Sequence, residues 1–200
     1  MLSKAELRRI KKAERDALAP EQRREWSTVM AETMSQTFEY QQCDIVTIYL
    51  SIGSEPDTLP LIQRAWSDTK KVYVPVVDPA SHHMVHKEYT SVCDIVTGTF
   101  GIPEPVGTET LTSSDINPGL LSVVPLLAFN ELLYRVGYGK GFYDRFLESR
   151  NFFAFGYGFT DSFSQEFEPE SHDIRLDGIV TEQGIVRIRR SVTRHVNISW

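Results

Sequence analysis

The run Arg135-Val-Gly-Tyr-Gly-Lys-Gly-Phe-Tyr-Asp144 places three glycines in alternation with a lysine and large side chains, and it ends on an aspartate. Glycines can adopt positive φ and let another molecule approach the backbone, so their N–H groups can form a concave anion nest below Lys140. An apolar run at 121–129 precedes the glycines, and a helix-compatible stretch at 142–147 follows them. We therefore predict a phosphate-binding loop between a buried strand and a helix whose dipole also favours phosphate.

The spacing of this loop is not that of the two commonest nucleotide signatures. No Ser or Thr follows Lys140, as a Walker A loop requires, and the glycines do not follow the pattern G-x-G-x-x-G. A turn whose glycines serve only tight packing is the alternative interpretation. Three glycines, two basic residues and Asp144 within ten positions favour phosphate binding, and Asp144 stands where a cation that bridges to the phosphates could be held.

Two amphipathic helices are predicted before the first strand. Ser3 and Glu6 form a capping box for the first helix, which ends before Pro20. The second helix begins at Pro20, and its apolar stripe consists of Trp26, Val29, Met30, Met34 and Phe38. Basic residues crowd these two helices, and such a run is more often a solvated face than a site. They are Lys4, Arg8, Arg9, Lys11, Lys12, Arg15, Arg23 and Arg24.

Buried strands are predicted at 45–50, 71–77, 121–127, 152–159 and 179–181, and the last pairs with 185–188. A helix from Thr58 to Trp66 separates the first two strands, and this short crossover favours parallel pairing. Residues 78–117 carry turn residues and a possible strand pair at 84–89, so we expect irregular structure there. The chain, residues 1–200, is predicted to be a single α/β domain. It has an open, mainly parallel sheet flanked by helices, Rossmann-like and three-layered, with ligand sites beyond the carboxyl ends of the strands.

Composition narrows the class of protein. The 200 residues are 41% hydrophobic and 24% charged, which suits one substantial core. The longest apolar run, 120–129, is far below the roughly 20 residues of a membrane span, and the charged N-terminus argues against a secretory signal. We therefore expect a cytoplasmic protein with no membrane partner. A net charge of −6 opposes a nucleic-acid partner, and a monomer is expected.

Cysteine and histidine offer no recognisable metal site. Cys43 and Cys93 have no partner at metal-ligand spacing, so we expect free thiols in a reducing compartment. The histidines follow no helical or cysteine-paired ligand pattern, and most are expected at the surface. They are His82, His83, His86, His172 and His195.

Several segments, taken in order, resemble one known family. Lys4-x-x-x-Arg8, Glu55-Pro-Asp-Thr58 and the glycine run, which follows Pro125-Leu-Leu-Ala-Phe129 and extends to Arg145, are similar to parts of the 5-formyltetrahydrofolate cyclo-ligase family, also called methenyltetrahydrofolate synthetases. Pro169-Glu-Ser-His-Asp173 and Thr181-Glu182 follow in the same order. The resemblance thus covers nearly the whole chain, and the glycine segment is its specific part.

The resemblance implies an activity. Family members use ATP and Mg²⁺ to convert 5-formyltetrahydrofolate to 5,10-methenyltetrahydrofolate, with release of ADP and phosphate. The formyl oxygen is a poor leaving group until the γ-phosphoryl is transferred to it, after which the nitrogen at position 10 can close the ring. The protein supplies positioning and charge neutralisation. Two alternatives remain open: a folate- or nucleotide-binding regulatory protein without turnover, and an ATP-dependent kinase or ligase for another small substrate.

The resemblance also implies roles for individual residues. The expected ATP contacts are Lys4, Arg8, Arg135, Val136, Gly137, Tyr138, Gly139, Lys140, Gly141, Phe142 and Tyr143. The expected catalytic residues are Lys140, Arg145 and Tyr143. Magnesium would be held by Asp144 and Asp173. The folate pocket would be lined by Leu50 and Glu55, whose carboxylate can accept hydrogen bonds from the pterin.

Some positions have a second interpretation or depart from the family pattern. Glu55 could instead cap the helix at Thr58, Asp173 could be a turn residue, and at least one of Tyr138, Phe142 and Tyr143 is expected in the core. The segment Asn130-Glu-Leu-Leu133-Tyr134 replaces the family's usual Asp-x-x-Gly, so we expect an altered turn before Arg135. Pro56 replaces an aliphatic residue and stiffens the loop after Glu55.

Overall fold

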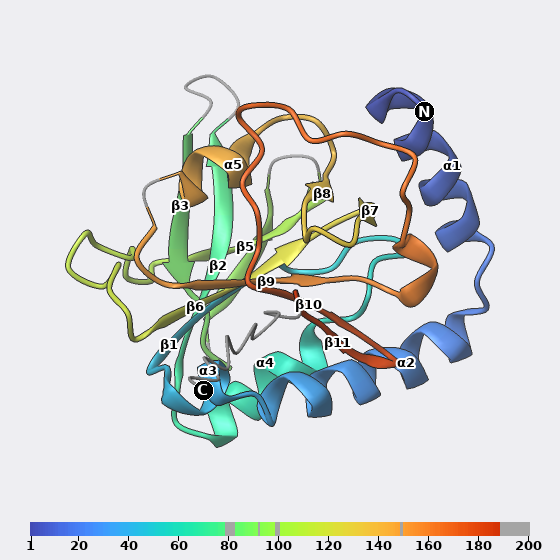
Figure 1. Cartoon of the computed structure of the whole chain (residues 1–200). Helices are drawn as coiled ribbons and strands as arrows, with labels where there is room; N and C mark the ends of the chain where they lie inside the picture. The colour runs from blue at the N-terminus through green and yellow to red at the C-terminus, as the bar shows by residue number, and fades with distance from the viewer. Residues whose placement is uncertain (79–82, 92, 99–100, 149, 189–200) are drawn as a thin grey trace, which may run out of the picture.

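In the computed structural model of the chain, residues 1–78, 83–91, 93–98, 101–148 and 150–188 are described. Its main sheet consists of β1 (Ile45–Ile48), β2 (Lys71–Asp78), β3 (His83–Glu88), β6 (Leu120–Pro125), β9 (Phe153–Tyr157), β10 (Gly178–Thr181) and β11 (Gly184–Val186). Figure 1 shows these strands, whose order across the sheet is β11-β10-β9-β6-β1-β2-β3. The five inner strands run parallel and the two outer ones antiparallel, which confirms the mainly parallel α/β sheet.

Strand β1 lies inside the sheet and pairs with β6 on one side and β2 on the other. Val46 lies opposite Leu121 and Val72, and all three side chains are buried, as expected for parallel strands covered on both faces. The crossover from β1 to β2 passes through α4 (Leu59–Ser67), which confirms the predicted β-loop-α-β unit. Because β1, β6, β9 and β10 are parallel, the loops that follow them meet at one edge of the sheet.

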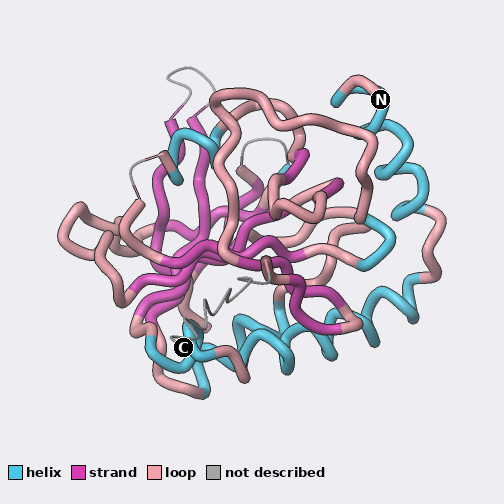
Figure 2. Tube along the Cα trace, viewed as in Figure 1, coloured by secondary structure: helices cyan, strands magenta, loops and turns pink. Residues whose placement is uncertain are grey.

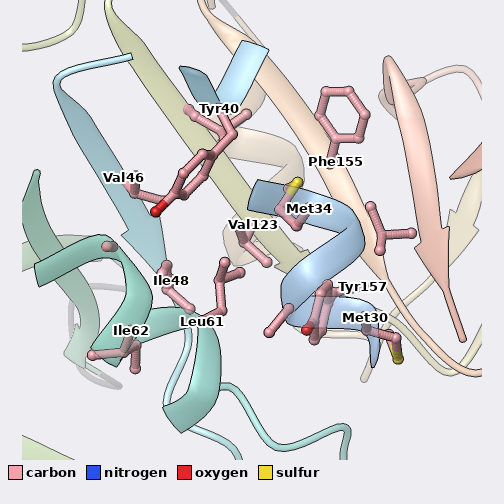
Figure 3. Packing of buried hydrophobic residues seen from close by; sticks show 14 of the residues in the cluster. Met30, Met34, Tyr40, Val46, Ile48, Leu61, Ile62, Val123, Phe155 and Tyr157 are labelled. Carbon is pink, nitrogen blue, oxygen red and sulfur yellow. The ribbon is translucent and has the colours of Figure 1, made fainter. Parts of the chain in front are cut away.

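Helices cover the two faces of the sheet unequally. Figures 1 and 2 show α2 (Pro20–Ser35), α3 (Phe38–Gln42) and α4 below one face, whereas the short α5 (Phe142–Leu147) and long loops cover the other. Figure 3 shows the apolar cluster under the first face, which includes Met30, Met34, Ile48, Leu61, Ile62 and Val123. A second cluster lies on the other face and includes Leu120, Val124, Phe129, Leu133, Leu147 and Ile179. Successive residues of β6 therefore point to opposite faces, and the three predicted layers are present.

The predicted apolar stripe of the second helix is partly wrong. Met30 and Met34 are fully buried, but Val29 is 41% exposed and Phe38 is 67% exposed. Phe38 does not continue α2, because Thr37 starts a separate helix, α3, by accepting a hydrogen bond from the N–H of Tyr40. The capping residue thus overrides the apolar spacing.

The irregular structure expected between 78 and 117 is also partly wrong. β3 agrees with the possible strand pair at 84–89 and pairs with β2 over six residue pairs, but β4 (Asp94–Thr97) and β5 (Pro103–Val106) form a small sheet where irregular structure is expected. All four side chains of β4 are exposed, so the strand has no buried face to produce an alternating pattern. Within the part of the chain that the structure describes, no helix is long and apolar enough to cross a membrane.

A hairpin stands between the buried strand and the glycine loop, where we had predicted a direct connection. After β6 the chain forms β7 (Ala128–Phe129) and β8 (Arg135–Val136), which pair with each other. In the turn, the side-chain oxygen of Asn130 accepts hydrogen bonds from the N–H groups of Leu132 (3.1 Å) and Tyr134 (3.0 Å). Leu133 takes the left-handed φ of 65° that glycine adopts without strain. Its buried side chain compensates by packing in the second cluster.

His86 is a buried exception to the expectation that most histidines lie at the surface, whereas His172 agrees with it. His86 is 3% exposed and its ring lies 4.3 Å from the ring of Phe146, while His172 is exposed. The Nε2 of His86 has no hydrogen-bond partner among the described residues. His82, His195 and the side chain of His83 lie outside the described part. Cys43 and Cys93 are free thiols, as expected.

We expect His86 to make the fold sensitive to acid. Burial lowers the pKa of His86 to about 4, below the 6.5 of an exposed histidine, so the unfolded chain takes up the proton first. Neutral His86 therefore contributes about 3 kcal/mol to the free energy of unfolding. This contribution is fully present above pH 6.5 and is lost as the pH falls toward 4. Urea unfolding between pH 7 and 4 measures it. His86→Leu should remove this part of the pH dependence and His172→Leu should not; equal slopes in both variants would contradict the assignment.

Candidate active site

Helix α1 (Lys4–Asp16) lies beside the carboxyl edge of the sheet (Figure 1), and basic side chains from one face of the helix make contacts there. The residues of that face are Lys4, Arg8, Lys11 and Arg15. Arg8 Nε donates to the carbonyl of Gly137 (2.8 Å), and Lys11 Nζ donates to the carbonyl of Asp161 (2.6 Å). Lys4 Nζ binds Asp173 Oδ2 (2.6 Å). For these residues a solvated face is the wrong interpretation.

The glycine loop after β8 has the backbone that its sequence predicts at two of three glycines. Gly139 has φ 90° and Gly141 has φ 68°. A Cβ at Gly139 would lie 3.1 Å from Cζ of Arg8, and a Cβ at Gly141 would lie 2.9 Å from Nη1 of Arg145. The left-handed backbone therefore favours glycine at both positions, and a Cβ there would also make the side chain of Arg8 or Arg145 shift.

Gly137 is different. Its φ is not left-handed, and no atom of the described residues lies within 4 Å of where a Cβ would be. The fold alone gives no reason for glycine at this position. The open space beside Gly137 is the kind of room that an approaching ligand needs.

The side chains around the glycines fall into exposed and buried groups. Lys140 is exposed, and its carbonyl accepts a hydrogen bond from Arg145 Nη2 (3.2 Å). The guanidinium of Arg145 also lies over the ring of Phe142, 5.2 Å from its centre. Val136 is buried in a small cluster with Leu7, and its carbonyl accepts the N–H of Leu127 (2.8 Å), so its side chain is not available to a nucleotide.

Two carboxylates predicted to hold magnesium lie beside buried or half-buried cations. Arg135 is buried; its Nη2 binds Asp144 Oδ1 (3.0 Å) and its Nη1 donates to the carbonyl of Ile174 (3.3 Å). Burial lowers the pKa of Arg135, and the charges of Asp144 and, more weakly, Asp173 oppose that effect. Asp173 also accepts the N–H of Glu170 (2.7 Å), so the turn interpretation holds as well. The charges of both predicted magnesium ligands thus favour the charged form of Arg135.

The described residues contain no group of three or more His, Cys, Asp or Glu side chains that could hold a metal ion. A Mg²⁺ ion in phosphoryl-transfer sites is usually bound by one or two carboxylates, and its remaining ligands are phosphate oxygens and water. The oxygen donors of Asp144 and Asp173 fit that kind of ion, bound together with a nucleotide. They do not fit a self-sufficient metal centre.

Glu55 lies in the loop after β1 and is 8% exposed. Its Oε2 accepts the N–H of Ile52 (2.9 Å), and its Oε1 accepts the hydroxyl of Tyr138 in the glycine loop. Burial raises the pKa of Glu55, while these hydrogen bonds and the charge of Arg15 act in the opposite direction. Burial and the charge of Glu55 in turn raise the pKa of Tyr143, which places this half-buried ring within electrostatic reach of Glu55.

Glu55 does not cap α4, so that alternative is wrong. Asp57 Oδ1 accepts the N–H of Leu59 (2.9 Å) instead. Thr58 holds the N-cap position, but its hydroxyl donates to the carbonyl of Tyr49 (2.8 Å). Leu50, the other residue predicted for the folate pocket, is half-buried and packs against the first apolar cluster. The Glu55 carboxylate is left to face the glycine loop.

Sequence reasoning missed Arg15 as a residue of the site. Its side chain is 7% exposed and donates a hydrogen bond to the hydroxyl of Tyr138, the residue that also contacts Glu55. A signal for it exists, because Lys4, Arg8, Lys11 and Arg15 are spaced by four, three and four residues and therefore share one helix face. Arg9 is out of phase and exposed. The composition of a charge run does not distinguish the two faces of a helix, whereas the spacing of its residues does.

A groove of ≈ 560 Å³ opens elsewhere, lined by Lys11, Phe129, Thr160, Asp161, Phe163, Thr181, Gln183, Gly184, Ile185 and Val186. It contains none of the glycine loop and neither Glu55 nor the two aspartates. The groove therefore shares Lys11 with the basic face of α1 but does not contain the candidate site.

Known proteins resemble this chain over most of its length. The sequence model of the 5-formyltetrahydrofolate cyclo-ligase family matches residues 1–182. The 5-formyltetrahydrofolate cyclo-ligase of Escherichia coli K12 is 33% identical over 174 residues, covering 84% of this chain and 93% of that protein. A probable 5-formyltetrahydrofolate cyclo-ligase of Schizosaccharomyces pombe is 28% identical over 163 residues, covering 74% of this chain and 80% of that protein. The structure of Aquifex aeolicus 5,10-methenyltetrahydrofolate synthetase superposes with a TM-score of 0.81 at 28% identity, covering 99% of this chain and 100% of that one.

Proposed function

Because the chain belongs to the 5-formyltetrahydrofolate cyclo-ligase family, we propose that it uses ATP and Mg²⁺ to convert 5-formyltetrahydrofolate to 5,10-methenyltetrahydrofolate, with release of ADP and phosphate. The observation that carries the proposal is the hydrogen bond between Tyr138 of the glycine loop and Glu55 of the loop after β1. It brings the predicted phosphate loop next to the predicted pterin carboxylate. A phosphoryl group can be transferred between two substrates only where their sites adjoin.

The reaction needs two displacements. The formyl oxygen attacks the γ-phosphorus, the bond to the β-phosphate oxygen breaks, and ADP leaves. The nitrogen at position 10 then attacks the formyl carbon, loses its proton, and phosphate departs with the former formyl oxygen. Mg²⁺, when bound, would neutralise charge on the transferring phosphates, and Asp144 and Asp173 are the residues that would hold it.

The chain's own residues supply charge and orientation in this proposal. Lys140 is exposed at the tip of the glycine loop, where its ammonium can meet the transferring group. Arg8 fixes the loop backbone through Gly137 and stands against Gly139, so it can also reach phosphate. Glu55 offers a carboxylate to the donor edge of the pterin, and its charge helps to raise the pKa of Tyr143. The ligands are small molecules.

A coupled assay tests the proposal directly. Purified protein with ATP, Mg²⁺ and 5-formyltetrahydrofolate should form ADP in step with the absorbance of the conjugated methenyl product. Tight folate or nucleotide binding with no ADP would favour a regulatory protein. Protection from thermal unfolding by ATP but not by the folate would favour a kinase or ligase for another substrate.

Gly137→Ala offers a sharper test of where the triphosphate lies. The added methyl meets no protein atom in the described structure, so the free energy of unfolding should change by less than about 0.5 kcal/mol. If phosphates approach this backbone, the methyl intrudes on them, and we expect KM for ATP to rise about tenfold, equivalent to about 1.4 kcal/mol. Steady-state kinetics and urea unfolding measure the two effects.

Gly139→Ala is the matched comparison, because its left-handed φ and the contact with Arg8 should make it less stable as well as less active. An unchanged KM for ATP in Gly137→Ala would place the triphosphate elsewhere.

A further inference from the structure

Arg15 binds three segments that are far apart in the sequence. Its Nη2 donates to the hydroxyl of Tyr138 (2.8 Å), its Nε to Ser54 Oγ (3.1 Å), and its Nη1 to the carbonyl of Leu126 (3.4 Å). These acceptors belong to the glycine loop, the loop after β1, and the end of β6. The five N–H groups of a guanidinium have a fixed fork geometry, so one side chain can set the relative positions of all three.

The contact with Tyr138 is one half of a chain of hydrogen bonds. Tyr138 accepts from Arg15 and donates its own proton to Glu55, whose other oxygen is held by the N–H of Ile52. The hydroxyl has one proton, and the bond from Arg15 directs that proton toward Glu55. The orientation of the carboxylate therefore depends on a guanidinium it does not touch.

A second contact fixes the same loop from its other side. Ser54 accepts from Arg15 and donates to Asp16 Oδ1, and Asp16 pairs with Lys12 (2.6 Å). The residue preceding Glu55 is thus attached to the end of α1. Helix α1 and the loop after β1 thus share two hydrogen bonds, both through Ser54.

We propose that Arg15 is a positioning residue for folate binding: through the hydroxyl of Tyr138 it fixes the orientation of the Glu55 carboxylate toward the pterin. The inference rests on the proposed function, because it assumes that Glu55 meets the folate. Arg15 is enclosed by the protein and acts on the substrate only through Tyr138 and Glu55.

The charges around Glu55 give the proposal a pH signature. The groups that face it are Arg15 from α1, Tyr138 from the glycine loop, Tyr143 from α5, and Tyr49 at the end of β1. Burial raises the pKa of each of these tyrosines, which keeps them neutral. Removing the cation Arg15 should therefore raise the pKa of Glu55. If folate binding needs the ionised carboxylate of Glu55, a variant without Arg15 should lose binding at a higher pH than the wild-type chain does as the solution is acidified.

Arg15→Met tests the proposal against Arg9→Met, a matched change of an exposed arginine on the same helix. We expect Arg15→Met to raise KM for 5-formyltetrahydrofolate about tenfold with kcat changed less than threefold, and to move the acid limb of kcat/KM up by about one pH unit. Arg9→Met should change neither. A fall in kcat at unchanged KM, or an acid limb that stays in place, would overturn the proposal.

Tyr138→Phe is a second test, needed in case Arg15→Met folds poorly. It removes only the hydroxyl that links Arg15 to Glu55. If the hydrogen bonds act as one chain, Arg15→Met and Tyr138→Phe should each raise KM for the folate, and the double variant should be no worse than the worse single variant. Effects that multiply would show two independent contributions and would overturn the chain.

The titration of Glu55 separates this inference from the proposed function. The ¹³C shift of the Glu55 carboxyl can be followed with pH in the wild-type chain, Arg15→Met and Arg9→Met, without any turnover. A higher pKa in Arg15→Met alone supports the link even in a chain that forms no product. If the wild-type chain is active and Arg15→Met titrates and binds folate like wild type, the inference fails and the proposed function stands.

Discussion

Replacing Lys140 with methionine is expected to lower kcat by about 10²- to 10³-fold, the effect of removing one preorganised charge from a transition state. Lys140 is exposed in the glycine loop, and its hydrogen bond with Arg145 is made by its backbone carbonyl rather than by its side chain. The side chain is thus available to the transferring phosphoryl. Because methionine preserves the loop backbone and buries no new group, the free energy of unfolding should not change by more than about 0.5 kcal/mol.

Product absorbance and urea unfolding, measured on the same preparations, check both parts of this prediction. Lys71→Met is the matched control: this exposed lysine begins β2, at the amino edge of the sheet, away from the loops that carry the site. It should retain wild-type kcat. A Lys140→Met variant that keeps more than about a tenth of the wild-type kcat would remove Lys140 from the reaction.

The parallel core of the sheet could be predicted because its residues carry a local signal. The run at β1 is β-branched and apolar, and its helix crossover is short, so periodicity and connection length agree. The antiparallel hairpin of β4 and β5 has no such signal, since its side chains are mainly exposed. Its pairing depends on backbone hydrogen bonds that no hydrophobic pattern reports.

The candidate site likewise contains residues that a local sequence signal indicates and residues that no such signal indicates. The glycine loop could be predicted because Gly139 and Gly141 have left-handed backbones that few other residues adopt. The hydrogen bond between Tyr138 and Glu55 joins residues 83 positions apart, and no sequence spacing indicates it. Arg15 is an intermediate case. Its spacing from Lys4, Arg8 and Lys11 shows which face of α1 it occupies, but its burial depends on what the helix packs against.

The ion pair of Arg135 and Asp144 gives Asp144 a role in the fold as well as in the candidate site. Arg135 is buried and Asp144 is its carboxylate partner at 3.0 Å. Removing one partner of a buried pair leaves an uncompensated charge, which typically costs about 3–5 kcal/mol. Because the side chain of Asp144 is 26% exposed, water screens part of this effect. We expect Asp144→Ala to lower the free energy of unfolding by about 2–3 kcal/mol.

The same variant should lose turnover by at least about 10²-fold, because Asp144 is also a proposed ligand of Mg²⁺. A double variant, Arg135→Met with Asp144→Ala, separates the two roles. It removes the buried charge together with its partner, so stability should recover toward the wild-type value while activity stays low. Urea unfolding and the coupled assay on the single and double variants provide the comparison. A double variant as unstable as Asp144→Ala would show that the ion pair is not the cause, and one that regains turnover would exclude Asp144 from the reaction.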